Sequence, residues 1–537
     1  MIASPRLHSS ILSFLAIGAL LVGACARRSP PAAPVVPDAA TTSPAAELDG
    51  KRAAALEALA RARAAKLSDV SRAISLPSIE RLVEDAEARR AQVTDAARDL
   101  DFARRALDAA RGYADVLANG EDPYDYARGP MVKAYRAEWD GSLQPYALYV
   151  PKDYDGARAW PLVVALHGAG SNHRHMLRRV FGLDNRAGES DLEATRNELP
   201  LPDVPALVVA PYGRGEVMGY DGLGGEDVLR VLADVRRSYN VDPDRITLTG
   251  LSMGGGGTWT LGLQHPELFA GLAPICGVTD TRRLVPEDER PDYDLAALEA
   301  LEPPAFAENA AGLRVLIFHG DADPTVPVAD SRRMVERFRK LGWLGKTVTY
   351  TEYAGVDHRA WAPAYADAKL LRTLAELKRT AKERVPARKK APPDRALPGL
   401  FGKSLPRQRP HLYVYGTHGA PEAVAQARAL ANGLADWGPG VGARFTVKRD
   451  ADVTAEDKAR FELVLIGASP LNALAPADKP APGEAAFRLV TKSASDPSRH
   501  VLIFGATTPA GFAKLGRFVG PNSSRRAPET NRDWLAF

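Results

Sequence analysis

The clearest chemical signal is a serine held in a run of small residues, Gly250-Leu251-Ser252-Met253-Gly254. The run follows the apolar segment Ile246–Thr249 and precedes Thr258–Gln264, which is predicted to be helical. A Gly-x-Ser-x-Gly pattern between a strand and a helix predicts a tight turn that exposes the serine hydroxyl as a nucleophile. The N-terminus of the following helix would favour negative charge that develops beside it. Ser252 is therefore the candidate nucleophile.

A serine nucleophile needs a general base, and the base needs a carboxylate that orients it. His358 follows the predicted strand Val348–Tyr353, and Asp323 follows the predicted strand Leu313–Phe318. Because the carboxyl ends of parallel strands meet at one edge of a sheet, we expect both side chains on the same rim as the serine. Asp321 is the rival acid, since it lies in the same loop as Asp323.

An acyl-transfer site also needs backbone N–H groups that face the developing oxyanion. Leu166-His167-Gly168-Ala169-Gly170 ends a predicted buried strand, and its glycines allow the backbone to turn its N–H groups inward. We assign one donor to Ala169 and the other to Met253, which directly follows the candidate nucleophile.

Neither a metal nor an organic cofactor is expected. His167, His173 and His175 lie close together in the sequence, but no carboxylate or cysteine accompanies them at the spacing of a zinc site. The chemistry of a serine nucleophile with a histidine base needs no further group.

The elements that must position these residues alternate along the chain. Apolar runs at 162–166, 206–210 and 315–318 are separated by helical stretches such as Asp227–Tyr239, and one helix over 366–383 is predicted to end this region. This alternation predicts an α/β protein with a mostly parallel, doubly wound sheet. Asp140-Gly141, between two β-type segments, predicts a hairpin before that sheet.

Residues 134–378, under half of the chain, resemble the α/β-hydrolase superfamily, and so predict the α/β-hydrolase fold. The matching pieces are Leu166-His167-Gly168, Gly225-Glu226-Asp227-Val228-Leu229, Val241-Asp242-Pro243-Asp244-Arg245-Ile246, Gly250-Leu251-Ser252-Met253-Gly254 and His319-Gly320-Asp321-Ala322-Asp323. They look like the secreted polyhydroxyalkanoate-depolymerase and feruloyl/acetylxylan-esterase group, and like the catalytic domain of prolyl oligopeptidases. The resemblance implies that Asp323, the second aspartate of the last piece, is the acid. Asp357-His358 with Trp361 departs slightly from the Gly-His that the group often has.

The sequence also predicts how the chain is divided. Apolar residues at three- and four-residue steps between Val93 and Leu117 predict helices, which could pair beside the catalytic body or form a partner-binding coiled coil. A second α/β unit follows a basic segment, and its Gly416–Gly419 could form a tight turn or hold an anion. We expect a lipoprotein signal peptide (1–25), a Pro/Ala-rich linker (26–50), a helical arm (51–130), an α/β-hydrolase catalytic domain (131–383), a basic linker (384–408), a small α/β domain of unknown role (409–522) and a tail (523–537).

The first residues predict export. Arg6 precedes the apolar stretch Ile11–Val22, which is too short to span a membrane. Val22-Gly23-Ala24-Cys25 resembles a bacterial lipobox, which implies that Cys25 is lipidated and anchors the protein to a membrane of the cell envelope. The alternative is an ordinary cleavage site. If Cys25 carries a lipid, Cys276 has no disulfide partner and is expected to pack in a buried strand.

Composition limits the other functions. The 537 residues are 45% hydrophobic and 25% charged, as in ordinary globular proteins. A net charge of +4 gives no case for a dedicated nucleic-acid binder, and two cysteines exclude a disulfide-rich scaffold.

The leading hypothesis is an exported serine hydrolase that cleaves small-molecule or polymer-bound carboxylic esters through an acyl-enzyme. A prolyl-oligopeptidase-like serine peptidase is the first alternative, because it would use the same three residues. A non-catalytic envelope binding protein is the second.

Overall fold

The computed structural model covers most of the chain. It describes residues 43–91, 93, 96–186, 188–189, 194, 200–216, 219–280, 299, 302–379, 410–436, 442–477, 486–493, 500–519 and 534–536. The predicted signal peptide with Cys25, most of the linker at 26–50 and the basic linker at 384–408 lie outside these residues. Among the helices of the described ranges, none has the length and apolar character needed to cross a membrane.

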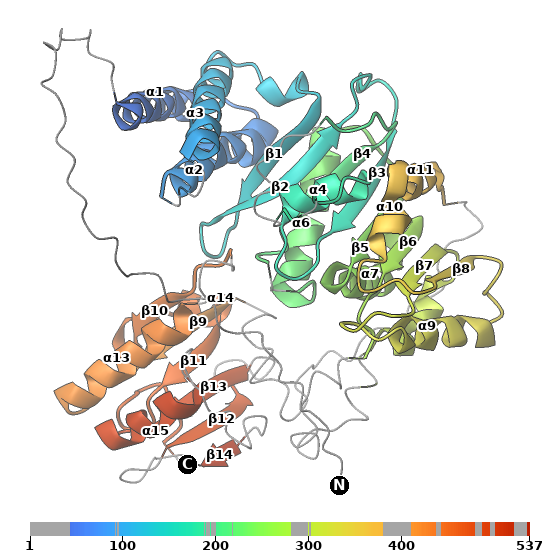
Figure 1. The fold of residues 1–537 in the computed structure, drawn as a ribbon. Coiled ribbons are helices and arrows are strands. Elements are labelled where there is room, and N and C mark those ends of the chain that lie inside the picture. The colour runs from blue at the N-terminus through green and yellow to red at the C-terminus, as the bar shows by residue number, and fades with distance from the viewer. Residues whose placement is uncertain are drawn as a thin grey trace, which may run out of the picture. The chain divides into compact units, whose positions relative to one another are not determined.

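The N-terminal helices number three in the described residues, where the sequence predicted a pair (Figure 1). They are α1 (Pro44–Ala64), α2 (Leu76–Ala91) and α3 (Ala96–Ala118), and a π-helical turn, Ser71–Ser75, leads into α2. Pro77 is the second residue of α2, but it does not begin a new helix, because the chain is already helical through Ser71–Ser75. The predicted apolar face of α3 is buried from Ala103 to Leu117, but Val93 precedes the helix and is 44% exposed, so its assignment to that face was wrong.

The hairpin predicted around Asp140-Gly141 is present. Strand β1 (Gly129–Arg136) pairs antiparallel with β2 (Leu143–Val150), and the register places Arg136 opposite Leu143. Helix α2 lies against this hairpin, because the Ser78 hydroxyl donates to the Ala134 carbonyl at 3.2 Å and accepts from the Ala134 N–H at 2.9 Å. A short 3₁₀ helix, Pro123–Asp125, precedes the hairpin.

The main sheet has eight strands in the order β1-β2-β4-β3-β5-β6-β7-β8. From β4 to β8 every neighbouring pair is parallel, which confirms the predicted mostly parallel sheet. Its remaining strands are β3 (Trp160–Leu166), β4 (Leu207–Pro211), β5 (Val241–Leu251), β6 (Gly271–Ile275), β7 (Arg314–Gly320) and β8 (Val348–Tyr353).

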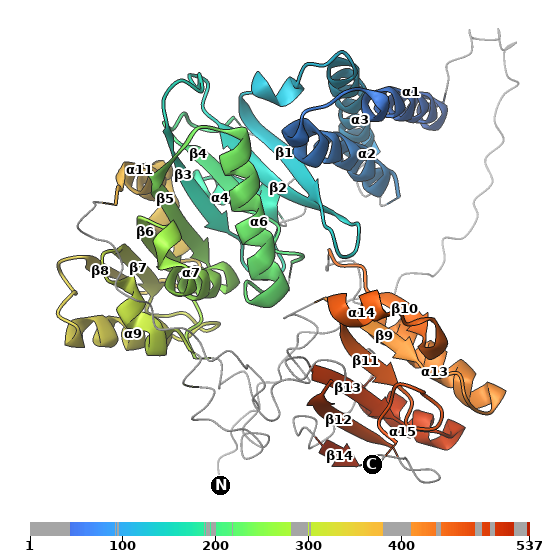
Figure 2. The same ribbon diagram turned by 180° about the vertical axis from the view of Figure 1, so that it is seen from behind.

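Helices cover both faces of this sheet, as a doubly wound fold requires. One face packs on α6 (Gly222–Ser238), α7 (Met253–Gln264) and α9 (Ala329–Lys340), seen in front of the sheet in Figure 2. The other packs on α4 (His173–Val180), α10 (Trp361–Tyr365) and α11 (Lys369–Glu376). Short 3₁₀ helices lie at Pro266–Leu268, Pro303–Ala310 and Ala366–Ala368.

The last helix of this body is shorter than predicted. The sequence predicted one helix over 366–383, but α11 begins at Lys369 and ends at Glu376. Asp367 and Ala368 both have a φ of +54°, which breaks the helical path before Lys369. Leu377 then takes an extended conformation.

The second unit is built on a six-stranded mixed sheet in the order β10-β9-β11-β13-β12-β14. The first four strands are parallel, and β12 and β14 are antiparallel additions that the sequence did not predict. Strand β14 comes from residues that we had assigned to the tail. The elements are β9 (His411–Tyr415), α13 (Pro421–Ala435), β10 (Thr446–Arg449), a 3₁₀ helix (Asp450–Asp452), α14 (Ala455–Arg460), β11 (Glu462–Ile466), β12 (Phe487–Lys492), β13 (His500–Gly505), α15 (Pro509–Val519) and β14 (Trp534–Ala536).

Candidate active site

Ser252 lies on a sharp turn between β5 and α7. Its φ of 54° and ψ of −117° are unusual for a residue with a side chain, and such conformations cost about 1–3 kcal/mol. The flanking glycines make the turn possible: a Cβ on Gly250 would lie 2.3 Å from the Gly254 carbonyl oxygen, and one on Gly254 would lie 2.1 Å from the Leu166 carbonyl oxygen. Because α7 begins at Met253, the serine hydroxyl stands at the positive end of a helix.

Ser252, His358 and Asp323 form one hydrogen-bonded chain. The Ser252 Oγ lies 2.9 Å from Nε2 of His358, and Nδ1 of His358 lies 2.7 Å from Oδ2 of Asp323. The Asp323 side chain is fully buried, whereas that of His358 is 19% exposed. The ring of His358 packs edge-on against Trp361, with 5.4 Å between the ring centroids. Three parallel strands therefore bring together three residues that are far apart in the sequence.

Backbone donors hold the Asp323 carboxylate in place. Its Oδ1 accepts hydrogen bonds from the N–H groups of Thr325 and Val326, each at 2.8 Å. These two N–H donors fix Oδ1, so Oδ2 is the oxygen that faces the imidazole. A charged carboxylate at Oδ2 keeps the proton of His358 on Nδ1, so Nε2 presents a lone pair to the serine hydroxyl.

The rival acid, Asp321, has a different role. Its Oδ1 accepts the Gly355 N–H at 2.6 Å on the exposed side of the loop. This bond ties the loop after β7 to the loop after β8, which carries His358. The two aspartates thus share a loop, but only Asp323 contacts the imidazole among the described residues.

His319 is a second histidine at the Asp323 carboxylate, and sequence reasoning assigned it no role. Its Nε2 lies 2.9 Å from the Val326 carbonyl oxygen and 3.3 Å from Oδ2 of Asp323. Since a carbonyl only accepts, Nε2 carries the proton and Nδ1 accepts from the Ser331 hydroxyl at 2.7 Å. Burial lowers the pKa of His319, which favours this neutral form. The signal was present, because His319 begins the same motif that contains Asp323.

The assigned oxyanion donors are the N–H groups of Ala169 and Met253, and Met253 directly follows the serine. The loop after β3 brings Gly168 close to it, since a Cβ on Gly168 would lie 3.5 Å from the Ser252 Cβ. Within the described ranges, the N–H groups of Ala169 and Met253 donate to no protein group, whereas the Gly170 N–H donates to the Glu216 carbonyl at 2.8 Å. Both assigned N–H groups are thus available to a ligand.

Cys276 lies beside His358 and Asp323. We expected it to lie within a buried strand, but it follows the end of β6. Strand β6 ends at Ile275, and Cys276 turns away from it with a φ of +39°. It is buried, as predicted, and its Sγ lies 3.5 Å from the His358 carbonyl oxygen. Burial raises the pKa of this thiol, so it stays protonated. Its Sγ, an Asp323 oxygen and a His358 nitrogen all lie within 4.8 Å of one another.

The other candidate sites are engaged in structural contacts. Both ring nitrogens of His167 lie against backbone carbonyl oxygens, at 2.8 and 2.9 Å. His175 contacts Ser171 and Asn185 through its two nitrogens, and His173 packs edge-on against Tyr212. In the second unit, the N–H groups of Gly416 and His418 donate to the carbonyl oxygens of Ile466 and Leu471, each at 2.9 Å.

Comparisons with known proteins show which families the chain resembles. Residues 222–383 match the model of the Prolyl oligopeptidase family. Poly(3-hydroxyalkanoate) depolymerase C of Paucimonas lemoignei is 25% identical over 160 residues, which cover 28% of this chain and 37% of that protein. "Probable feruloyl esterase C" of Aspergillus terreus is 25% identical over 140 residues, which cover 25% of this chain and 46% of that protein.

A solved thermostable esterase is 28% identical, with a TM-score of 0.33, and the match covers 47% of this chain and 63% of that one. The predicted resemblance to α/β-hydrolase serine hydrolases is confirmed by the family model and the curated relatives. The chain spans less than half the length of the two curated relatives.

Proposed function

We propose that the protein is a serine hydrolase that cleaves carboxylic esters. The observation that carries the proposal is the hydrogen-bonded chain from Asp323 through His358 to Ser252, with the serine on a strained turn. The strain of this turn is costly, and such strain persists mainly at functional sites.

In the first half of the reaction, the Ser252 Oγ attacks the acyl carbon while its proton passes to Nε2 of His358. The oxygen of the former carbonyl gains negative charge, which the N–H groups of Ala169 and Met253 stabilise. The bond from the acyl carbon to the alcohol oxygen then breaks. The alcohol leaves with the proton from His358, and the acyl group stays on the serine.

In the second half, water attacks the acyl-enzyme and gives a proton to Nε2 of His358. The bond between the acyl carbon and Oγ breaks, and the proton returns to Ser252. The carboxylic acid is released. During both halves the buried Asp323 carboxylate stabilises the imidazolium that forms 2.7 Å away.

The choice of an ester rests on the relatives. The two curated proteins named above are, by name, a poly(3-hydroxyalkanoate) depolymerase and a probable feruloyl esterase. We infer from them that the acyl group belongs to a small molecule or a polymer.

Turnover of short p-nitrophenyl esters by the purified protein, beside Ser252→Ala, tests the proposal. We expect ester hydrolysis in the wild type and a loss of about 10³-fold or more in the variant. Full activity in purified Ser252→Ala would contradict it. If the wild type cleaves neither esters nor peptides, the non-catalytic binding protein becomes the better hypothesis.

A serine peptidase is the second candidate, because the matching family model is that of prolyl oligopeptidases. Aminoacyl-proline p-nitroanilides, assayed with the same pair of proteins, separate the two. Peptide cleavage without ester turnover would reverse their order.

We also propose that the protein is exported and anchored through Cys25, on the lipobox alone. Metabolic labelling with a radioactive fatty acid in a bacterial host should mark the wild type. Cys25→Ser should remain unlabelled and leave the membrane fraction, and labelling of that variant would contradict the anchor.

A further inference from the structure

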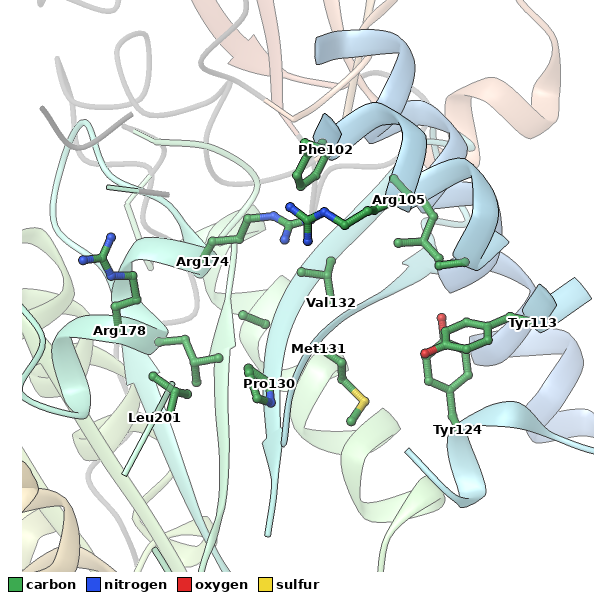
Figure 3. A pocket seen from close by; sticks show the side chains of 15 residues that line it. Phe102, Arg105, Tyr113, Tyr124, Pro130, Met131, Val132, Arg174, Arg178 and Leu201 are labelled. Atoms are coloured by element: carbon green, nitrogen blue, oxygen red, sulfur yellow. The ribbon is translucent and has the colours of Figure 1, made fainter. Parts of the chain in front are cut away.

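A cavity of about 400 Å³ lies between α3, β1 and α4, away from the candidate active site (Figure 3). Its volume falls within the range of about 300–1,000 Å³ that is usual for small-molecule sites. The walls are mainly apolar, and include Phe102, Ala106, Met131, Val132 and Leu177. Ser252, His358 and Asp323 do not line it, so a ligand here would not occupy the proposed reaction centre.

Among the described residues, the lining of the cavity includes Arg105, Arg174 and Arg178 and no acidic side chain. Figure 3 shows the side chains of Arg105 and Arg174 pointing toward one another beside Phe102, whereas the guanidinium of Arg178 points away. The guanidinium carbon of Arg174 lies 5.4 Å from the centroid of the Phe102 ring. Arg105 follows Phe102 by three residues on α3, so it lies on the same helical face. Both positive groups therefore meet at one end of an apolar cavity.

The charge at Arg174 is only partly balanced by protein. Its Nη2 donates to Oδ2 of Asp85 at 2.6 Å, and Arg81 donates to Oδ1 of the same carboxylate at 2.6 Å. Burial alone would raise the pKa of Asp85, but the two arginines outweigh it and lower the pKa. One carboxylate thus serves two guanidinium groups, so Arg174 shares its partner with Arg81.

The opposite end of the cavity is aromatic. Tyr113 and Tyr124 meet edge to face there, with ring centroids 5.4 Å apart (Figure 3). An inorganic anion would satisfy the arginines and leave these apolar walls in contact with water. A neutral apolar molecule would bury the walls and leave the guanidinium groups without a new partner.

We propose that this cavity binds a carboxylate with an extended apolar body. The carboxylate pairs with the guanidinium groups of Arg105 and Arg174, whose planar N–H donors match two carboxylate oxygens. The apolar body fills the space between α3 and α4 and reaches toward Tyr113 and Tyr124. This site is independent of the proposed ester hydrolysis, so its test measures binding.

Dodecanoate binding to the full-length protein, measured by isothermal titration calorimetry, tests the proposal. Arg105 is exposed and joined to Asp101, so Arg105→Gln should fold normally and weaken dodecanoate binding about tenfold, the value of one charge-assisted hydrogen bond. Ala109→Phe places a ring in the cavity and should abolish binding. Arg111→Gln is the matched control on α3, because Arg111 does not line the cavity, and it should bind as the wild type does.

Dodecan-1-ol has the same alkyl chain as dodecanoate but no carboxylate, so it measures the contribution of the charged group. We expect it to bind at least tenfold more weakly than dodecanoate. The proposal is overturned if dodecanoate shows no binding up to about 1 mM. It is also overturned if Ala109→Phe binds unchanged, or if the alcohol binds as tightly as the carboxylate. A thermal unfolding midpoint for each variant verifies that lost binding does not reflect an unfolded protein.

Discussion

Replacing Asp323 by Asn should nearly abolish ester hydrolysis, for a reason that the hydrogen bonds make specific. The N–H groups of Thr325 and Val326 both donate to Oδ1, so the amide oxygen of Asn must take that position. The amide NH₂ then replaces Oδ2 and faces Nδ1 of His358, 2.7 Å away in the wild type. Nδ1 must accept this hydrogen bond, which moves the imidazole proton to Nε2. In that tautomer His358 cannot accept the proton of the serine.

The expected loss follows from the burial of this pair. The Asp323 side chain is fully buried, and removing one partner of a buried charge pair costs about 3–5 kcal/mol. Here the imidazolium forms only during the reaction, so the cost falls on the transition state. At 1.36 kcal/mol for each factor of ten, kcat/KM should fall by about 10²–10⁴-fold. Hydrolysis of p-nitrophenyl acetate at neutral pH measures it.

Asp321→Asn is the matched control. Asp321 precedes Asp323 by two residues and lies on the exposed side of the same loop, where its carboxylate accepts a hydrogen bond from the Gly355 N–H. An Asn oxygen can accept the same bond, so activity should stay within about threefold of the wild type. The reasoning is refuted if Asp323→Asn, folded by its thermal midpoint, keeps more than about a tenth of the activity. It is equally refuted if Asp321→Asn loses as much.

Two further predictions concern stability, and urea unfolding measures both. Burial lowers the pKa of Lys133 from 10.5 to about 8. Between pH 8 and pH 10.5, Lys133 keeps its proton in the unfolded chain but has lost it in the folded protein. The contribution of Lys133 should therefore raise the free energy of unfolding by about 3 kcal/mol from pH 7 to pH 10.5. Relative to the wild type, Lys133→Met should lack this gain, and an equal gain in both proteins would contradict the prediction. Gly250→Ala should cost about 3 kcal/mol, because its Cβ would meet the Gly254 carbonyl. Gly112→Ala, with open space around its Cβ, should be at least as stable as the wild type; equal stability of the two alanine variants would exclude the steric argument.

Local patterns in the sequence were sufficient for the elements around the serine. The apolar run before Gly250 and the glycines on both sides of Ser252 predicted a strand, a sharp turn and a helix, and the structure has β5, the turn and α7 in that order. These features depend on neighbouring residues and on steric limits within one turn. The same holds for the Asp140-Gly141 hairpin, where the turn residues determine the register of β1 and β2.

Helix ends and the antiparallel additions were less predictable. Nothing in the composition of 366–383 marked the break at Asp367 and Ala368, where packing holds two residues at positive φ. Strands β12 and β14 pair across about forty-five residues of sequence, and such pairing depends on tertiary contacts and not on local propensity.

The sequence by itself determined which residue types could react and in what order they occur, because the turn around Ser252 and the motif around Asp323 are local. The family resemblance already favoured Asp323 over Asp321, but only the tertiary structure gives the contacts of each carboxylate, since the direction of each side chain depends on how the loops after β7 and β8 pack. The positions of His319 and Cys276 beside the carboxylate, and the meeting of Arg105 with Arg174, also required it. Each depends on contacts between segments distant in sequence, and burial and hydrogen bonding across those segments determine them.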